Sequence, residues 1–124
     1  MDVEMNVLVV DDFAAMRRIV KRVLKDLGFK HIVEAENGKA ALSELKKEKM
    51  GLIVSDWNMP EMTGLEFLKA VRIDAEFKSI PFIMVTAEGQ KENIVEAIKA
   101  GVSNYIVKPF TPDTLKQKLE AVLE

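Results

Sequence analysis

The sequence predicts an α/β domain with a parallel sheet at its centre, and three observations support this class. Five short apolar runs alternate with five longer segments whose apolar residues recur at helical spacing. Several runs are apolar at consecutive positions, as strands are when helices cover both faces of a parallel sheet. The 124 residues have the size of one compact domain, and no Ser- or Pro-rich linker divides them. We therefore expect one domain over residues 1–124.

The five predicted strands are short and evenly distributed along the chain. They cover residues 7–10, 32–35, 52–55, 81–85 and 105–107. Each connection from one parallel strand to the next should be right-handed, and ligands of such sheets bind beyond the carboxyl ends of the strands. Functional residues are therefore expected at those ends.

The helical segments follow the strands in order. The first is the best defined, because its apolar positions form one stripe and Gly28 follows as a C-terminal cap. That stripe contains Met16, Ile19, Val20, Val23, Leu24 and Leu27. The apolar positions of the other four are Ala41, Leu42 and Leu45; Leu65, Leu68 and Val71; Ile94, Val95 and Ile98; and Leu115, Leu119 and Val122.

Helix boundaries are also visible in the sequence. Thr63 and Glu66 have the spacing of a capping box before the third helix. Gly101 ends the fourth, and Thr111 followed by Pro112 suits the start of the fifth. The first helix is rich in basic residues, and we expect them to form a solvated face, with docking to an acidic partner as the alternative. These residues are Arg17, Arg18, Lys21, Arg22 and Lys25.

Composition excludes several kinds of chemistry. The chain has no Cys and only one His, so it cannot form disulfides, a thiolate nucleophile, or a zinc site built on Cys or three His residues. With 18 basic and 20 acidic residues, its net charge of −2 disfavours nucleic acid as a partner. The longest apolar run, residues 80–85, is far shorter than the roughly 18 residues that cross a bilayer. No secretory signal is visible, and we expect a cytoplasmic location without a membrane partner.

Charged residues follow three of the predicted strands. Asp11 and Asp12 follow the first, Asp56 the third and Lys108 the fifth, while Thr86 follows the fourth. Because the carboxyl ends of parallel strands meet at one edge of the sheet, these side chains should lie close together there, on what we call the rim. Two like charges about 4 Å apart repel by roughly 4 kcal/mol at an effective dielectric constant near 20, so a cation is needed there. Oxygen ligands without Cys or His select a hard cation, which predicts Mg²⁺ together with a phosphoryl group.

Each of these residues has an ordinary structural explanation as well. Asp11 or Asp12 could cap the first helix, Asp56 could begin a turn toward Pro60, and Thr86 could cap the fourth helix. Capping alone would seldom place all of them on one rim, so their combination favours a magnesium-dependent phosphoryl site. The glycines form neither a P-loop nor a dinucleotide fingerprint, and the phosphoryl group must therefore come from another molecule.

Five segments carry a resemblance to a known family. They are Val-Val-Asp-Asp-Phe at 9–13, Met-Arg-Arg-Ile-Val at 16–20, Asp-Trp-Asn-Met-Pro at 56–60, Val-Thr-Ala-Glu at 85–88 and Lys-Pro-Phe-Thr at 108–111. Over nearly its whole length the sequence resembles the receiver domains of two-component response regulators, and among them the single-domain CheY-type chemotaxis regulators. The resemblance implies a flavodoxin-like (βα)5 fold, doubly wound, with strand order 2-1-3-4-5. The apolar pattern alone predicts only the α/β class.

The resemblance also assigns roles to the residues on the rim. It implies that Asp56 accepts the phosphoryl group and becomes a 4-aspartylphosphate. Asp11, Asp12, Asp56 and the backbone carbonyl of Asn58 would hold Mg²⁺, and Lys108 would neutralise charge on the transferring oxygens. In this role the chain is a signalling protein and not an enzyme, although it would catalyse its own phosphoryl transfer and autodephosphorylation.

Further roles implied by the resemblance concern the output. Thr86 would donate its hydroxyl to the phosphoryl group, and the ring of Tyr105 would turn into the space that this movement leaves. Asn58 and Glu88 would tune the lifetime of the phosphorylated state, and the bond between Lys108 and Pro109 would be cis. The fourth helix, fifth strand and fifth helix would form a docking face, for which the candidates are Lys91, Ile94, Tyr105 and Lys118.

The implied partners are a CheA-type sensor histidine kinase and a FliM-type flagellar motor switch protein, with a phosphatase as a third candidate; the chain would act as a monomer. Three alternatives stay open. One is the stand-alone receiver of a phosphorelay outside chemotaxis. A magnesium-dependent phosphatase with an Asp nucleophile is disfavoured because Asn58 stands where that chemistry usually places a second carboxylate. A flavodoxin-like cofactor carrier is disfavoured because Asp11 and Asp12 would repel its phosphate.

Overall fold

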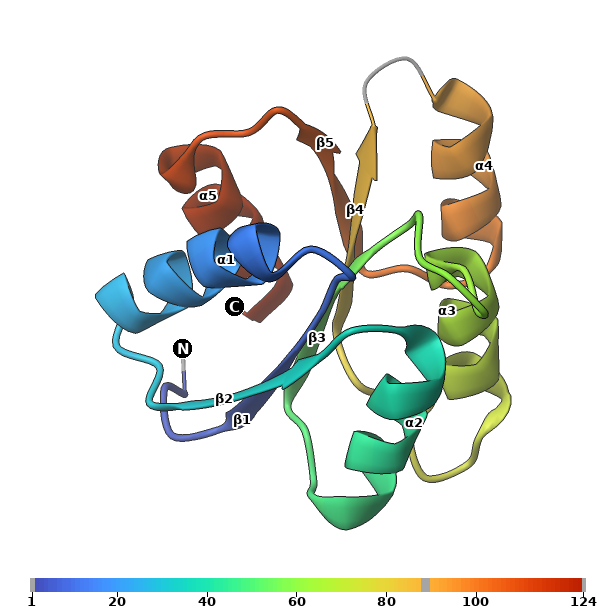
Figure 1. Ribbon diagram of the computed structural model, residues 1–124, viewed down its shortest axis with the longest axis horizontal. Helices are drawn as coiled ribbons and strands as arrows, with labels where there is room; N and C mark the ends of the chain where they lie inside the picture. The colour runs from blue at the N-terminus through green and yellow to red at the C-terminus, as the bar shows by residue number, and fades with distance from the viewer. Residues whose placement is uncertain (1, 88–89, 124) are drawn as a thin grey trace.

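The computed structural model describes residues 2–87 and 90–123 and shows a central sheet with helices on both faces (Figure 1). The strands are β1 (Asn6–Val10), β2 (His31–Ala35), β3 (Leu52–Asp56), β4 (Phe82–Ala87) and β5 (Asn104–Lys108). The helices are α1 (Ala14–Asp26), α2 (Gly38–Lys47), α3 (Gly64–Ile73), α4 (Lys91–Lys99) and α5 (Pro112–Leu123). Strands and helices alternate throughout, which confirms the predicted α/β class.

All strand pairs are parallel, and the sheet has the order β2-β1-β3-β4-β5. The doubly wound, flavodoxin-like arrangement is therefore confirmed. Its register determines which side chains meet at the carboxyl edge. Val10 is level with Ser55, so Asp11 and Asp56 come next on neighbouring strands. Asp56 is level with Val85, and Ala87 is level with Lys108.

Two hydrophobic layers hold the sheet between its helices. Val7 and Val9 pack toward α1 and α5, whereas Leu8 and Val10 pack toward α2, α3 and α4. Successive side chains of a strand point to opposite faces, so a strand that is covered on both sides must be apolar at consecutive positions. This explains the continuous apolar runs in the sequence.

Three residues of the predicted apolar stripes are exposed, contrary to expectation. They are Ile19 on α1 and Val95 and Ile98 on α4. The buried residue of α4 is Ala97, whose side chain is small, so only a narrow strip of this helix faces the core. The helical pattern overestimated how much of each helix faces the core.

The predicted helix boundaries are confirmed. Thr63 and Glu66 form a reciprocal capping box, with backbone-to-side-chain distances of 2.9 and 3.2 Å. The hydroxyl of Thr111 accepts a hydrogen bond from the amide of Thr114, near the start of α5. Gly28 has a φ of 103° after α1, in the left-handed region that glycine adopts without strain. Within the described ranges, no helix combines the length and apolar character needed to cross a bilayer.

Candidate metal and phosphoryl site

Three carboxylates meet at the carboxyl edge of the sheet. Asp11 and Asp12 directly follow β1, and Asp56 is the last residue of β3. One carboxylate oxygen from each lies within 4.8 Å of the others. Asp11 and Asp56 are only 3% and 5% exposed, while Asp12 faces solvent. The fold therefore brings together three oxygen donors, two of which are shielded from water.

Lys108 supplies a positive charge beside these acids. It ends β5, and its Nζ lies 3.0 Å from Oδ1 of Asp56. The bond between Lys108 and Pro109 is cis. One ammonium group faces three carboxylates, so the rim holds more negative than positive charge.

The electrostatic cost of this arrangement is visible in the acids. Burial raises the pKa of Asp11 from 3.8 to about 6, although the backbone amide of Phe13 donates a hydrogen bond that opposes the change. Burial also raises the pKa of Asp56, and the hydrogen bond and charge of Lys108 act in the opposite direction. Both carboxylates are thus less stable in their charged form than in water. A bound cation would remove that penalty.

Thr86 contributes a hydroxyl to the same edge. It lies on β4 one residue beyond Val85, which is level with Asp56. Its side chain is buried, with an exposed fraction of 1%, and no described residue forms a hydrogen bond with Oγ1. Leaving a buried polar group unpaired costs about 1 to 3 kcal/mol. The hydroxyl is therefore available to an acceptor that enters the site.

The junction between β3 and α3 keeps Asp56 in place. The amide of Gly64, the first residue of α3, donates to the carbonyl of Trp57 at 2.8 Å. A Cβ at Gly64 would overlap with the carbonyl oxygen of Asp56 and lie 2.9 Å from Cα of Trp57. Only glycine permits so close an approach. Trp57 is itself buried next to Asp56.

The remaining predicted residues differ in their position and exposure. Asn58 is exposed, two residues after Asp56, and Glu88 lies outside the described residues. Tyr105 is half-buried on edge strand β5, and Nζ of Lys118 lies 5.0 Å from the centroid of its ring. Lys91 on α4 is exposed and Ile94 is partly buried.

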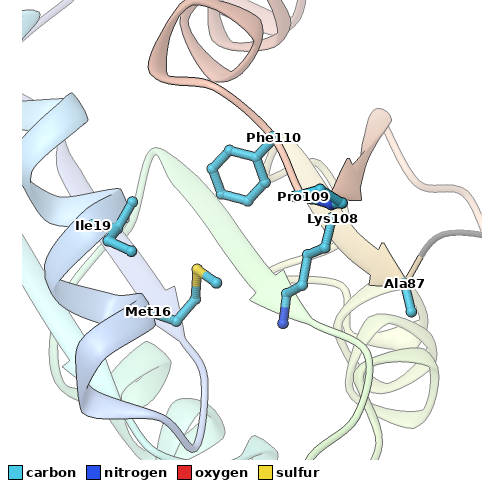
Figure 2. A pocket seen from close by; sticks show the side chains of 6 residues that line it. All are labelled: Met16, Ile19, Ala87, Lys108, Pro109 and Phe110. Atoms are coloured by element: carbon cyan, nitrogen blue, oxygen red, sulfur yellow. The ribbon is translucent and has the colours of Figure 1, made fainter.

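An apolar cavity of about 550 Å³ lies beside Lys108 and was not foreseen from the sequence. Figure 2 shows Met16 and Ile19 on α1 at one side, and Phe110 and Pro109 after β5 at the other. Ile19, whose burial was predicted wrongly, lines this cavity.

Arg17 was predicted to belong to a solvated basic face, and this is wrong. Its side chain is 17% exposed, and its guanidinium contacts both Glu34 and the backbone carbonyl of Asp11. The signal in the sequence was Glu34, a carboxylate within an otherwise apolar segment, but the sequence does not place it beside the first helix.

The comparisons with known proteins agree with this geometry. Residues 7–120 match the family of response regulator receiver domains. The chain is 53% identical over 120 residues to chemotaxis protein CheY-3 of Vibrio cholerae, covering 97% of this chain and 92% of that protein. It is 50% identical to chemotaxis protein CheY of Pseudomonas aeruginosa, covering 97% of each. The structure of the chemotaxis response regulator CheY4 of Vibrio cholerae superposes with a TM-score of 0.88 at 39% identity, covering 96% of this chain and 98% of that one.

The chain therefore belongs to the response regulator receiver domain family. These matches confirm the predicted function of a phosphorylation-activated response regulator in chemotaxis. The protein is a signalling protein, and its three acids form a cluster able to hold a metal ion.

Proposed function

We propose that Asp56 is the phosphoryl acceptor of this regulator, and that the rim around it holds Mg²⁺. The observation that carries this assignment is the 3.0 Å ion pair between Asp56 and Lys108. Among the described residues, Asp56 is the acid of this cluster that contacts a lysine. A carboxylate nucleophile needs a nearby cation because negative charge accumulates on the phosphoryl oxygens during transfer. Oδ1 of Asp11 instead accepts a hydrogen bond from the backbone amide of Phe13 at 2.9 Å.

The donor set fits Mg²⁺. Asp11, Asp12 and Asp56 offer only carboxylate oxygens, and the backbone carbonyl of Asn58 would be a fourth ligand. Two of these acids have raised pKa values through burial, so a divalent cation would stabilise the form that binds it. When bound, Mg²⁺ neutralises phosphoryl oxygens and orients the group for displacement.

The residues of the chain divide the chemistry between them. An Asp56 oxygen attacks phosphorus, the bond to the donor's leaving group breaks, and the leaving group departs with the electron pair. Lys108 neutralises charge on the phosphoryl oxygens, and the unpaired hydroxyl of Thr86 donates a hydrogen bond to one of them. Water later attacks phosphorus, which returns the Asp56 carboxylate and releases phosphate. Asn58 and Glu88 are proposed to adjust the rate of this hydrolysis.

The output is proposed to leave through α4, β5 and α5. A phosphoryl group adds about −1.5 to −2 charge and three acceptor oxygens, which draw Thr86 toward it. Tyr105 then changes its position, and with it the docking face. This face consists of Lys91, Ile94, Tyr105 and Lys118. Coupling of this kind is typically about 1 to 3 kcal/mol, enough to shift an existing equilibrium.

The proposed donor is a sensor histidine kinase of the CheA type, and the proposed target is a FliM-type flagellar motor switch protein. The two chemotaxis relatives support this assignment. A phosphatase is the third proposed partner. We do not propose nucleic acid as a partner. We propose that residues 1–124 act as one receiver domain, as a monomer in the cytoplasm.

Trp57 provides the test of the acceptor, because it is the only Trp and is buried beside Asp56. In the wild-type protein, its fluorescence should change once on addition of Mg²⁺ and again on addition of acetyl phosphate. Asp56→Asn should lose the second change, whereas Asp26→Asn, at an exposed acid on α1, should keep both. A full second change in Asp56→Asn would refute the assignment.

Tyr105 provides the test of the output. Tyr105→Ala should accept phosphoryl groups at the wild-type rate but lose the phosphorylation-dependent gain in affinity for a motor-switch peptide. Tyr105→Phe, which keeps the ring beneath Lys118, should retain most of that gain. An undiminished gain in Tyr105→Ala, measured by titration before and after phosphorylation, would exclude Tyr105 from the coupling.

A further inference from the structure

Arg17 joins three parts of the chain around the metal site. Its Nη1 donates to the backbone carbonyl of Asp11 at 2.6 Å, and its Nε lies 3.1 Å from Oε1 of Glu34 on β2. Glu34 also pairs with Lys21 at 3.2 Å. The guanidinium thus connects α1 and β2 to the backbone that follows β1.

The carbonyl that Arg17 holds belongs to the peptide between Asp11 and Asp12. A peptide group is planar, so fixing its oxygen fixes the direction in which the chain leaves Asp11. Asp11 is already attached on its other side, where its amide donates to the carbonyl of Ala35 at 3.1 Å. The contact with Arg17 therefore restrains the placement of Asp12 relative to Asp11, together with the hydrogen bond from the amide of Phe13 to Oδ1 of Asp11 at 2.9 Å.

Apolar packing gives this loop little other support. Phe13, the residue at the N-terminal boundary of α1, is 67% exposed. Asp12 is also exposed, and it carries the same charge as its neighbour Asp11. Repulsion between the two carboxylates favours conformations in which they separate. The polar contacts of Arg17 and of the Phe13 amide with Asp11 oppose this separation.

Glu34 keeps the guanidinium in its orientation. Burial disfavours the charged carboxylate, but hydrogen bonds from Lys21 and Arg17 outweigh this effect and lower the pKa of Glu34. The pair is therefore charged at neutral pH. Arginine suits the bridging position because its rigid fork of donors reaches two acceptors at once, whereas the ammonium of lysine is a single point.

We propose that Arg17 is a positioning residue for the metal site: supported by Glu34, it holds the peptide between Asp11 and Asp12 so that both carboxylates face Asp56. This inference rests on the magnesium site proposed above. It concerns a residue outside the acid cluster, which acts on the metal only through the loop.

The sign of the effect separates positioning from simple electrostatics. Arg17 is a cation close to a cation site, so on charge alone its removal should strengthen Mg²⁺ binding. If it positions the loop, its removal should weaken binding. Arg17→Lys keeps the charge but loses the two-acceptor bridge, so it should weaken Mg²⁺ binding in the positioning case and bind like the wild type in the electrostatic case.

The experiment is a Mg²⁺ titration followed by Trp57 fluorescence, with thermal unfolding in EDTA to verify that each variant is folded. Loss of a residue that orients a ligand typically weakens metal affinity by about 10-fold or more, and we expect this for Arg17→Ala and a smaller loss for Arg17→Lys. Arg18→Ala, at the exposed neighbouring position, is the matched control and should bind within about twofold of the wild type.

Glu34 supplies an independent variant. Glu34→Ala should weaken Mg²⁺ binding less than Arg17→Ala, and the double variant should bind no more weakly than Arg17→Ala alone, because Glu34 acts through Arg17. Mg²⁺ binding by Arg17→Ala or Arg17→Lys that equals or exceeds that of the wild type would overturn the inference. Absence of a Mg²⁺ response in the wild type would instead overturn the metal site, and the inference with it.

Discussion

The two ends of the parallel strands, called the amino edge and the carboxyl edge, compensate side-chain charge in opposite ways. Near the amino ends of the strands, Arg72 of α3 is surrounded by acceptors: its Nε donates to the carbonyl of Gly101 at 2.8 Å, and its Nη1 to those of Lys78 and Ile80 at 3.1 and 2.7 Å. Its guanidinium also lies 6.0 Å from the ring centroid of Phe82. At the carboxyl ends, three acids share one lysine.

The difference indicates that charge at the amino edge stabilises the fold, whereas charge at the carboxyl edge is left for a ligand to compensate. The three hydrogen bonds of Arg72 hold α3 to the segments before β4 and β5. Asp11 and Asp56 carry charges that the described residues compensate only in part, and Thr86 has a donor without an acceptor. The first arrangement is complete, while the second has excess negative charge that the proposed Mg²⁺ would compensate and a hydroxyl from which the proposed phosphoryl group would accept a hydrogen bond.

Removing the charge from the amino edge should have the largest effect on folding. Arg72→Ala deletes three charged hydrogen bonds to the backbone, and we expect the free energy of unfolding to fall by about 3 kcal/mol. Mg²⁺ affinity should stay unchanged, because the site is at the other edge. Urea unfolding and Mg²⁺ titration measure the two quantities.

Lys69→Ala is the control for this change, since Lys69 is exposed on the same helix. It should alter stability by less than about 0.5 kcal/mol. Weakened Mg²⁺ binding in Arg72→Ala would mean that the two edges are coupled and that the comparison fails.

At the carboxyl edge, a buried acid should make the protein less stable as pH rises. Asp11 has a pKa of about 6 in the fold against 3.8 for an ordinary aspartate, so its contribution to stability is complete below pH 4 and is lost as pH rises through 6. Without Mg²⁺, the contribution of Asp11 to the free energy of unfolding should therefore fall by about 2 to 3 kcal/mol between pH 4 and pH 7.

Asp11→Asn tests this origin. It should remove the part of the pH dependence that Asp11 contributes and raise stability at pH 7 by about 2 kcal/mol, while greatly weakening Mg²⁺ binding. Asp26→Asn, at an exposed acid, should leave the pH profile unchanged. A profile in Asp11→Asn with the slope of the wild type would assign the dependence to another group.

The smallest expected effect concerns the unpaired hydroxyl. Thr86→Val replaces it with a methyl group of similar volume, so the unphosphorylated protein should gain up to about 1 kcal/mol in stability. The same variant should lose the phosphorylation-dependent gain in affinity for the motor-switch peptide. Lower stability measured by urea unfolding would show that the hydroxyl has a partner after all.

Much of the fold was predictable because it depends on local pattern. Consecutive apolar residues marked the strands, and Thr63 with Glu66 marked a helix start. Strand order depends on pairing between distant segments, and only the family resemblance supplied it. The acids at the rim were found because their positions after the strands already placed them at one edge.

The errors have a common physical cause: a local pattern does not show which other segments a helix meets once the chain has folded. A helical stripe shows which residues share a side of a helix, but not how wide the surface opposite is, so the exposure of Ile19, Val95 and Ile98 was missed. Arg17 was missed for the same reason. Its importance depends on Glu34, which lies far away in the chain and beside α1 only after β2 has paired with β1.

The contact between Gly64 and Asp56 has a consequence for the direction of signalling. α3 begins directly against the end of β3, and the close contact at Gly64 leaves no room for α3 to move toward Asp56. α4 packs on the sheet through the small side chain of Ala97 and exposes Val95 and Ile98, so fewer apolar contacts hold it than hold α3. We therefore expect phosphorylation at Asp56 to displace α4 more than α3.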